Sequence, residues 1–410
     1  MTKLNLNFIR KQFPALNSDW IFMDNAGGTQ VVRQVGERIQ DYLYNSNVQL
    51  GASYATSQLA GERVAAAQLA MAQFVNADEP EEIILGSSTT QLLQNLSKSL
   101  VRFFKPGDEV IVTNCDHEAN IGPWLNMEMH GINIKTWKIN PETLLFDLED
   151  LGHLMTEKTR LVAFTHTSNI LGTINPVKEI TSFVHKHGAL VCVDGVAFAP
   201  HRLVDVKDLD VDFYVFSLYK IYGPHYSLLY GKNEILAELP NINHFFITQQ
   251  ETPYKFQPGN VNFELSYGLL GITDYLDSVY DIHAGANSSD YREKMSFVFE
   301  LFAKHEETIV APLIDFLNNK TNVRIIGEET SDKNIRVPTV SFIVDNVKSS
   351  TIPHKVDEHK IAIRYGDFYA RRLIDDLDLS KQDGIVRVSL VHYNTIEEVD
   401  KLVGIFDQLF

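Results

Sequence analysis

Lys220 stands at a position where a buried strand is expected to end. Two apolar runs flank it, residues 211–216 before and residues 226–230 after, and Gly223-Pro224 closes the turn between them. Burial disfavours a charged ammonium group and lowers its pKa. Because a neutral lysine amine is a nucleophile, the sequence makes Lys220 a candidate for imine chemistry with a carbonyl compound.

Asp194 supplies a second chemical group upstream of this lysine. It ends the apolar run 191–193 and precedes Gly195, so a carboxylate is expected at the end of another strand. Pyridoxal 5'-phosphate (PLP) uses this pair of groups: a lysine that forms an imine with its aldehyde, and an aspartate that keeps its pyridine nitrogen protonated. A buried Lys-Asp ion pair in an α/β core would explain the two residues equally well.

Two further polar sites also follow predicted strands. Residues 86–91, Gly-Ser-Ser-Thr-Thr-Gln, join a strand to a helix, where free N–H groups and hydroxyls can bind a phosphate. Ser and Thr are also common helix caps, so this motif alone is weak. His117 could be a metal ligand, a surface histidine or a flat ring for stacking. It has no second histidine four residues later, so the zinc protease motif is absent and no metal is expected.

Short apolar strands alternate with helices from residue 82 onward, and this pattern predicts one mostly parallel sheet with helices on both faces. Ligands bind such sheets at the carboxyl ends of the strands, where all the candidate residues fall. The predicted strands are 20–25, 83–86, 109–113, 132–139, 159–166, 191–194, 211–217 and 226–230. The predicted helices are 31–45, 58–75, 89–104, 119–129 and 176–187.

The pattern changes after residue 284 to that of a smaller α+β domain. We expect a large domain over residues 16–284 and a small one over 285–410 together with residues 1–15. The small domain is predicted to contain strands 323–326, 339–345, 360–364 and 385–391, a helix over 367–377 and an amphipathic final helix. Residues 328–337 are polar and predict an exposed loop.

Composition excludes several classes of partner. The 410 residues are 44% hydrophobic and carry a net charge of −17 without any basic run, so neither nucleic acid nor an anionic membrane is an expected partner. No apolar stretch reaches the ~18 residues of a membrane span, and no signal peptide is visible. Two cysteines, Cys115 and Cys192, indicate a reduced, cytoplasmic setting.

Taken together, the motifs resemble the class V aminotransferase family, and most closely its cysteine desulfurase branch. The resemblance begins near residue 13 and continues in order to the end of the chain. It is carried by Asp24-Asn25-Ala26, Thr89-Thr90, His117 with Ala119-Asn120, Thr165-His166, Ser168-Asn169, Leu171-Gly172-Thr173, Asp194-Gly195, Ser217, Tyr219-Lys220, Tyr222-Gly223-Pro224, Arg387-Val388-Ser389-Leu390 and Tyr393-Asn394-Thr395.

The resemblance implies a PLP enzyme of fold type I that acts on an α-amino acid and forms a homodimer with shared active sites. By this match Lys220 would hold PLP and move protons, and Asp194 would pair with the pyridine nitrogen. His117 would stack on the ring, and Asn169 would bind the ring hydroxyl or the substrate carboxylate. The remaining expected contacts are Thr89, Thr90, Ser217, Tyr219 and a partner's Asn260 for the phosphate, and Arg387, with Arg364 as the alternative, for the substrate carboxylate.

The sequence departs from the family pattern at three positions. Tyr219 replaces the usual histidine before the lysine, and it can still donate to a phosphate. Ala197 stands where a Gln or His usually supports the ring hydroxyl. Tyr369 occupies the loop position at which persulfide-forming desulfurases carry their cysteine.

The missing cysteine predicts the type of reaction. Our hypothesis is a lyase that eliminates a sulfur group from the β carbon of an amino acid without a protein-bound persulfide. An aminotransferase or an amino-acid epimerase of the same family is the alternative. A non-catalytic binding protein with the same fold is the alternative from another class.

Overall fold

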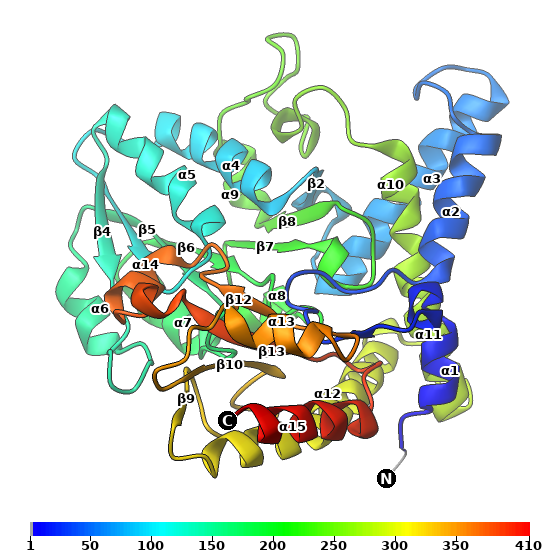
Figure 1. Ribbon diagram of the computed structural model, residues 1–410. Helices are drawn as coiled ribbons and strands as arrows, with labels where there is room; N and C mark the ends of the chain where they lie inside the picture. Colours follow the sequence, from blue (N-terminus) through cyan, green and yellow to red (C-terminus); the bar gives the residue numbers. More distant parts are fainter. Residues whose placement is uncertain (1–2) are drawn as a thin grey trace.

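A seven-stranded sheet forms the centre of the larger part of the molecule (Figure 1). The structure is a computed structural model and describes residues 3–410. The strand order is β2-β8-β7-β6-β5-β3-β4, and β8 alone runs opposite to the other strands, which confirms the mostly parallel sheet. The strands are β2 (Ile83–Gly86), β3 (Glu109–Thr113), β4 (Asn133–Trp137), β5 (Thr159–Thr165), β6 (Leu190–Asp194), β7 (Phe213–Ser217) and β8 (Ser227–Gly231).

Side chains from the same strands point alternately into two apolar layers, because successive residues of a strand face opposite sides of a sheet. Val110 and Val112 of β3 belong to the apolar cluster that includes α4 and α5, whereas Ile111 belongs to the cluster that includes α3, α7 and α11. Helices therefore cover both faces, as a parallel sheet requires. Their bounds are α1 (Leu6–Lys11), α2 (Arg33–Asn45), α3 (Ala55–Val75), α4 (Thr89–Phe103), α5 (Gly122–Leu125), α6 (Leu148–Leu154), α7 (Val177–Lys186), α8 (Val206–Leu209), α9 (Asn233–Glu238), α10 (Phe263–Gly268) and α11 (Leu270–Ala284).

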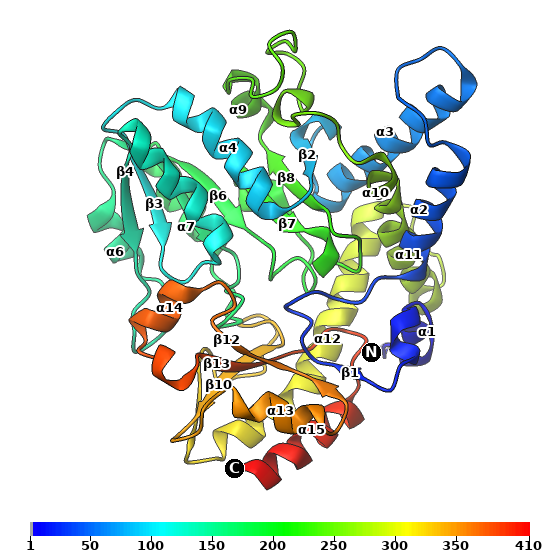
Figure 2. The same cartoon turned by 45° about the horizontal axis from the view of Figure 1, so that its top comes forward.

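A second, antiparallel sheet lies below the first, with the order β12-β13-β10-β9 (Figure 2). Its apolar cluster includes the last part of α12, together with α13 and α15. A short parallel pair, β1 (Ile21–Phe22) with β11 (Ile361–Ala362), joins the N-terminal segment to this region. The other elements are α12 (Tyr291–Asn318), β9 (Val323–Ile325), β10 (Thr339–Val344), α13 (Thr351–Asp357), β12 (Arg364–Gly366), α14 (Arg371–Asp376), β13 (Ile385–Ser389) and α15 (Ile396–Leu409).

We keep a division of the chain near residue 284 as a proposal. The helix α12 belongs to the apolar clusters of both sheets, because Phe302 packs in the cluster of the large sheet and Leu313 in that of the small sheet. Ile9 and Phe13, from the segment that we assigned to the small domain, pack in the cluster of the large sheet. Residues 1 and 2, assigned with them, lie outside the described residues.

The structure differs from the sequence-based expectation in several segments. The strand predicted over 360–364 is divided into β11 (Ile361–Ala362) and β12 (Arg364–Gly366), which belong to different sheets. The helix predicted over 119–129 is broken into short turns around α5, since Pro123 lacks a backbone N–H and starts a new helix. The helix predicted from residue 367 begins only at Arg371, because Phe368 and Tyr369 have φ angles of 50° and 61°.

The prediction that residues 328–337 form an exposed loop was wrong for its last part. Arg336 is fully buried there, and its guanidinium group donates to the backbone carbonyls of Glu328 and Thr339. Because backbone oxygens satisfy this charge, no acidic partner in the sequence reveals its burial.

None of the helices within residues 3–410 combines the length and the apolar character that a membrane span needs.

Candidate active site

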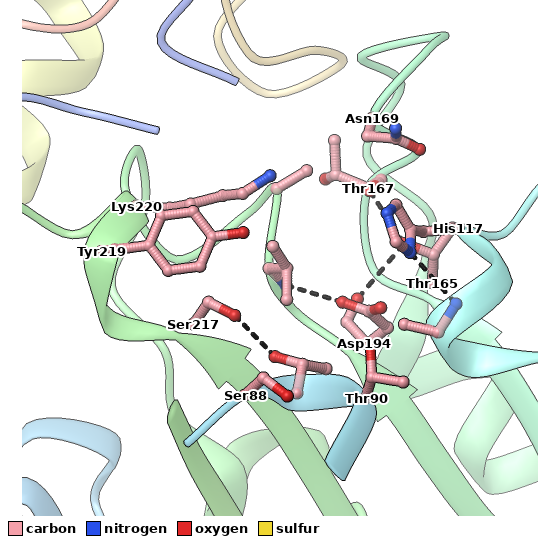
Figure 3. A pocket seen from close by; sticks show the side chains of 14 residues that line it. Ser88, Thr90, His117, Thr165, Thr167, Asn169, Asp194, Ser217, Tyr219 and Lys220 are labelled. Atoms are coloured by element: carbon pink, nitrogen blue, oxygen red, sulfur yellow. Dashed lines mark hydrogen bonds between the residues drawn. The ribbon is translucent and has the colours of Figure 1, made fainter. Parts of the chain in front are cut away.

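The carboxyl ends of β2, β3, β5, β6 and β7 meet at one cavity (Figure 3). Each of these strands ends in or is followed by polar residues that line it, as expected for a ligand site in a parallel sheet. Eight of the predicted residues line this cavity: Thr89, Thr90, His117, Asn169, Asp194, Ser217, Tyr219 and Lys220. The other lining residues are Ser88, Ala119, Thr165, Thr167, Val196 and Ala197.

Lys220 lies in the turn that follows β7 and is 8% exposed. Its Nζ atom donates to the backbone carbonyl of Ala26 over 2.5 Å. Burial, and then the positive charge of Arg387, lowers the pKa of Lys220 to about 8. A substantial fraction of the amine is therefore neutral and nucleophilic slightly above neutral pH.

Asp194 ends β6, and its Oδ1 atom accepts the backbone N–H of Val196 over 2.9 Å. Burial raises the pKa of Asp194 to about 6, although this hydrogen bond and the charge of Lys220 oppose the shift. The next residue has to be glycine, because a Cβ atom on Gly195 would overlap the ring of Tyr214. The carboxylate is thus fixed at the base of the cavity and is mostly ionised at neutral pH.

His117 lies beyond the end of β3 as the N-cap of a short turn, with its Nδ1 atom accepting the N–H of Ala119 over 3.0 Å. Burial, followed by the charges of Lys220 and Arg387, lowers the pKa of His117 to about 4. The ring is therefore neutral and carries its proton on Nε2. A neutral flat ring at this place suits stacking better than acid catalysis.

Asp116, directly before His117, is a residue that the sequence did not single out for a role. Its carboxylate accepts from Asn120 over 2.7 Å and from the backbone N–H of Thr165 over 3.2 Å. Burial, together with the nearby charge of Asp194, raises the pKa of Asp116 to about 7 against the effect of these hydrogen bonds. Asp116 therefore connects β3 to β5 behind the cavity. Its position three residues after a predicted strand was the available signal.

The N-terminus of α4 forms the lower wall of the cavity in Figure 3. Ser88 caps this helix by accepting the N–H of Gln91 over 3.2 Å, and the Thr89 hydroxyl lies 2.7 Å from that of Ser217. Hydroxyl groups, unpaired N–H groups and the positive end of a 15-residue helix together favour a phosphate. The phenol of Tyr219 adds a further hydroxyl group at the cavity.

Arg387 lies next to this cavity without lining it. Its Nη1 atom donates to the carbonyl of Asn169 over 3.1 Å, and its Nη2 atom to Asp24 over 3.0 Å. Burial lowers the pKa of Arg387 to about 10, while Asp24 acts in the opposite direction. The Nε atom has no partner within residues 3–410. Arg364, the alternative, also approaches Asp24, at 3.7 Å, so one carboxylate lies between two guanidinium groups.

Asn260 is the one predicted contact that lies apart from these residues. It borders a different cavity, beside Ser87 and Gln91 on the outer side of the start of α4. Asn260 therefore shares a cavity with Ser87 and Gln91, which belong to the segment predicted to bind the phosphate, but it does not line the cavity of Lys220. The expected contact of Asn260 with the phosphate in a partner subunit's site therefore stays a proposal.

The residues present fit PLP. A buried amine, a buried carboxylate, a neutral aromatic ring and a helix N-terminus with hydroxyl groups surround one cavity. Two buried oxygen atoms at the same cavity, Thr167 Oγ1 and Asn169 Oδ1, also lack a partner within residues 3–410. Polar atoms of this kind are expected to meet a ligand. Residues 3–410 contain no group of three or more His, Cys, Asp and Glu side chains that could hold a metal ion.

Comparison with known proteins decides the family. The family model described as Aminotransferase class-V matches residues 21–402. The chain belongs to this family. Class V aminotransferases and cysteine desulfurases use PLP, so this protein is a PLP-dependent enzyme with the fold type I architecture.

Individual relatives support the assignment to the class V family over nearly the whole chain. An aminotransferase-like protein of Gibberella zeae, FGM3, is 43% identical, with 98% of each chain covered. A cysteine desulfurase-like protein of Aspergillus flavus, ustD, is 33% identical over 99% of this chain and 91% of its own length. The crystal structure of the cysteine desulfurase CsdA of Escherichia coli superposes with a TM-score of 0.82 at 28% identity, with 98% of each chain covered.

Replacing Asp194 with Asn should have opposite effects on the two forms of the enzyme. In the cofactor-free form the pKa of Asp194 is raised from 3.8 to about 6, so folding stability falls as pH rises from about 4 to 6, by up to about 3 kcal/mol. Asp194→Asn should therefore melt higher than the wild type at pH 7 without cofactor, and equally at pH 4.

With PLP bound, Asp194→Asn should gain much less thermal stabilisation than the wild type, because the pairing with the pyridine nitrogen is lost. Melting curves with and without PLP at both pH values provide the measurement. The exposed Asp400→Asn in α15 serves as the matched control and should change neither curve. A variant that melts below the wild type at pH 7 in the cofactor-free form would contradict the assignment of the burial cost to Asp194.

Proposed function

We propose that this protein is a PLP-dependent lyase that eliminates a sulfur-containing group from the β carbon of an α-amino acid without forming a protein persulfide. One observation carries the proposal: the loop before α14 presents Tyr369, not a thiol, beside the cavity, with its ring 5.1 Å from that of His117. Tyr369 is 70% exposed, so its side chain is accessible to solvent.

The two cysteines of the chain support this proposal by their positions. Cys115 and Cys192 are both buried, at 1% and 0% exposure, and burial raises the pKa of each thiol well above its ordinary value. Persulfide formation needs an accessible thiolate, because the thiolate is the attacking species. Cys192 also lies inside β6 and packs in the apolar layer with α4. Neither thiol can move to the cavity without breaking up the core.

In the proposed site, Lys220 would hold PLP covalently, and Asp194 would keep its pyridine nitrogen protonated. PLP, when bound, withdraws electrons from the substrate's Cα and so makes its proton acidic. His117 would stack on the ring. The phosphate would be held by Thr89 and Thr90 at the start of α4, together with Ser217 and Tyr219 at and after the end of β7.

Lys220 would also move the proton in the reaction. With its pKa lowered to about 8 by burial, the Nζ amine can accept a proton from the substrate's Cα and return it elsewhere near neutral pH. Direct loss of a β sulfur group then needs no second nucleophile. Return of the proton to the opposite face of Cα would instead give the epimerase alternative. Transfer of the proton to the aldehyde carbon of the cofactor would give the aminotransferase alternative. Both use the same residues.

Arg387 would bind the substrate carboxylate, with Asn169 beside it. The guanidinium fork matches a carboxylate, and its Nε atom is buried without a partner within residues 3–410. Asp24 currently neutralises Arg387 and approaches Arg364, so an incoming carboxylate would share or displace this contact. Such an exchange keeps the buried charge paired in both states.

The proposed active form is a homodimer in which Asn260 completes the phosphate site of the partner. Support comes from the position of Asn260, which lines a different cavity from that of Lys220, and from exposed aromatic residues. Tyr44 is 76% exposed, Tyr54 51% and Phe245 98%. Aromatic side chains are enriched at protein interfaces.

Mixed dimers should reveal whether the sites are shared. Lys220→Ala and Asn260→Ala subunits should each be inactive or weak alone, since one lacks the lysine and the other a phosphate contact. In the heterodimer, the Asn260→Ala subunit keeps Lys220 and would receive Asn260 from its partner. Co-expression with two affinity tags should thus restore one active site per dimer. A fully active monomer in sedimentation would rule the shared site out.

Arg387→Ala should raise the KM for the amino acid by about 10- to 150-fold, because a buried charge-assisted contact is lost. The visible absorption band of bound PLP should persist. Arg387→Lys should recover little, since an ammonium group does not reproduce the fork. The exposed Arg371→Ala, which breaks only pairs with Asp367 and Asp375, is the matched control. An unchanged KM in Arg387→Ala, with a raised one in Arg364→Ala, would transfer the role to Arg364.

The reaction type can be tested with a cysteine-free enzyme. Cys115→Ala/Cys192→Ala should release sulfide, pyruvate and ammonia from L-cysteine or a related substrate as the wild type does, and neither protein should carry a persulfide by mass spectrometry. Tyr369→Cys, which adds an exposed thiol beside His117, is the positive control for detection. Release of sulfur that depends on Cys115 or Cys192 would refute the lyase. A keto acid of the intact substrate, or its enantiomer, would favour the aminotransferase or the epimerase.

A further inference from the structure

Thr167 places a buried hydroxyl group at the cavity with no hydrogen-bond partner within residues 3–410. The residue is 1% exposed, so water does not compensate freely for the missing contact. Its backbone is held firmly: the Thr165 hydroxyl donates to the carbonyl of Thr167 over 2.8 Å, and Thr167 forms a bridge with Ile174. These contacts hold the backbone of Thr167 beside the cavity, and an unpartnered hydroxyl there is free to donate to a ligand.

Two other buried threonine hydroxyls within residues 3–410 lack partners, those of Thr173 and Thr181. Neither residue lines the cavity. Thr181 belongs to α7 on the outside of the sheet. Thr167 therefore differs from them by its location, and this difference is what points to a ligand.

The groups around the cavity fix which edge of a PLP ring would face Thr167. In PLP, the carbon that bears the aldehyde lies between the hydroxyl-bearing carbon and the phosphate-bearing carbon, and the ring nitrogen lies opposite to it. Lys220 marks the aldehyde, Asp194 the nitrogen, and the start of α4 with Ser217 the phosphate. Figure 3 shows Thr167 and Asn169 across the cavity from Ser88 and Ser217. The edge that remains for Thr167 is the one with the ring hydroxyl.

Ala197 strengthens this assignment. It lines the cavity as well, and it occupies the position at which the family usually places a Gln or His as support for the ring hydroxyl. A methyl group cannot donate a hydrogen bond. The ring oxygen therefore needs a donor from another part of the chain.

We propose that the Thr167 hydroxyl donates to the ring oxygen of PLP and takes over the contact that Ala197 cannot make. The proposal rests on the placement of PLP given under Proposed function. It also separates the two roles considered for Asn169: with the ring oxygen bound by Thr167, Asn169 is left for the substrate carboxylate beside Arg387.

The contact has a spectroscopic consequence. A donor to the ring oxygen stabilises its anionic form and so lowers the pKa of the proton that this oxygen shares with the lysine-derived nitrogen. Loss of the donor in Thr167→Val should raise the pKa at which the visible band titrates by about one unit. PLP should also bind about ten-fold more weakly in equilibrium titrations. Valine is nearly isosteric with threonine, so packing is preserved.

Three variants make the experiment specific. Thr167→Ser keeps the hydroxyl and should titrate like the wild type. Thr173→Val removes an unpartnered buried hydroxyl away from the cavity and should leave the band unchanged. Ala197→Gln in the Thr167→Val background restores a donor and should return the pKa toward the wild-type value.

An unshifted band in Thr167→Val, or the same shift in Thr167→Ser, would overturn the assignment of the hydroxyl. Should Thr167→Val fail to fold or to bind PLP, the comparison of Thr167→Ser with the wild type decides, because equal loss in both variants excludes the hydroxyl as the cause. The placement of PLP itself would be overturned by a different result: a wild-type protein that shows no visible PLP band, or a band that persists in Lys220→Ala.

Discussion

Burial of charge at one edge of the large sheet is the constraint on which the site depends. Lys220, Asp194 and Arg387 all lie where water is largely excluded, and desolvation is the largest influence on the pKa of each. A buried charge is tolerated only when it is paired or hydrogen-bonded. The same burial that makes the site costly also makes the amine of Lys220 nucleophilic near neutral pH, so the cost and the chemistry have one cause.

The segment after β1 provides much of the necessary pairing. Asp24 accepts from Arg387, and the carbonyl of Ala26 accepts from Lys220. Asn25 bonds the carbonyl of Ser389 over 3.0 Å, and the N–H of Thr29 donates to the carbonyl of Tyr219 over 3.2 Å. One short crossing of the chain therefore connects the small sheet, the turn of the lysine and the arginine. A change in the position of this crossing would alter the electrostatics of all three at once.

The sequence was sufficient for the features that follow from local pattern. Strand-helix alternation predicted the sheet, and the position of Asp194 and Lys220 after apolar runs predicted their place at its carboxyl edge. Residues whose role depends on distant partners were not predictable in this way. Arg336 is buried because backbone carbonyls from two segments meet it, and Thr167 matters because its hydroxyl has no partner within the described chain. Neither condition leaves a periodic signal in the sequence.

The loop around Tyr369 has a strained backbone beside the candidate active site. Phe368 and Tyr369 are consecutive residues in the left-handed region, a conformation that costs roughly 1–3 kcal/mol for each such residue and persists only where surrounding contacts hold it. Those contacts are present. The ring of Phe368 stacks on Arg387, with the guanidinium carbon 3.8 Å from the ring centre, and its carbonyl accepts from Asn169 over 2.9 Å.

The same loop is also anchored on its other side. The carbonyl of Tyr369 accepts the N–H of Glu118 over 2.8 Å, and Arg372 forms a two-contact ion pair with the Glu118 carboxylate at 3.0 and 3.1 Å. A persulfide mechanism needs a thiol that travels between substrate and acceptor, and hence a loop that can leave its place. The contacts with Arg387 and Asn169 on one side and with Glu118 on the other hold this loop in place, which supports the proposed reaction without a travelling thiol.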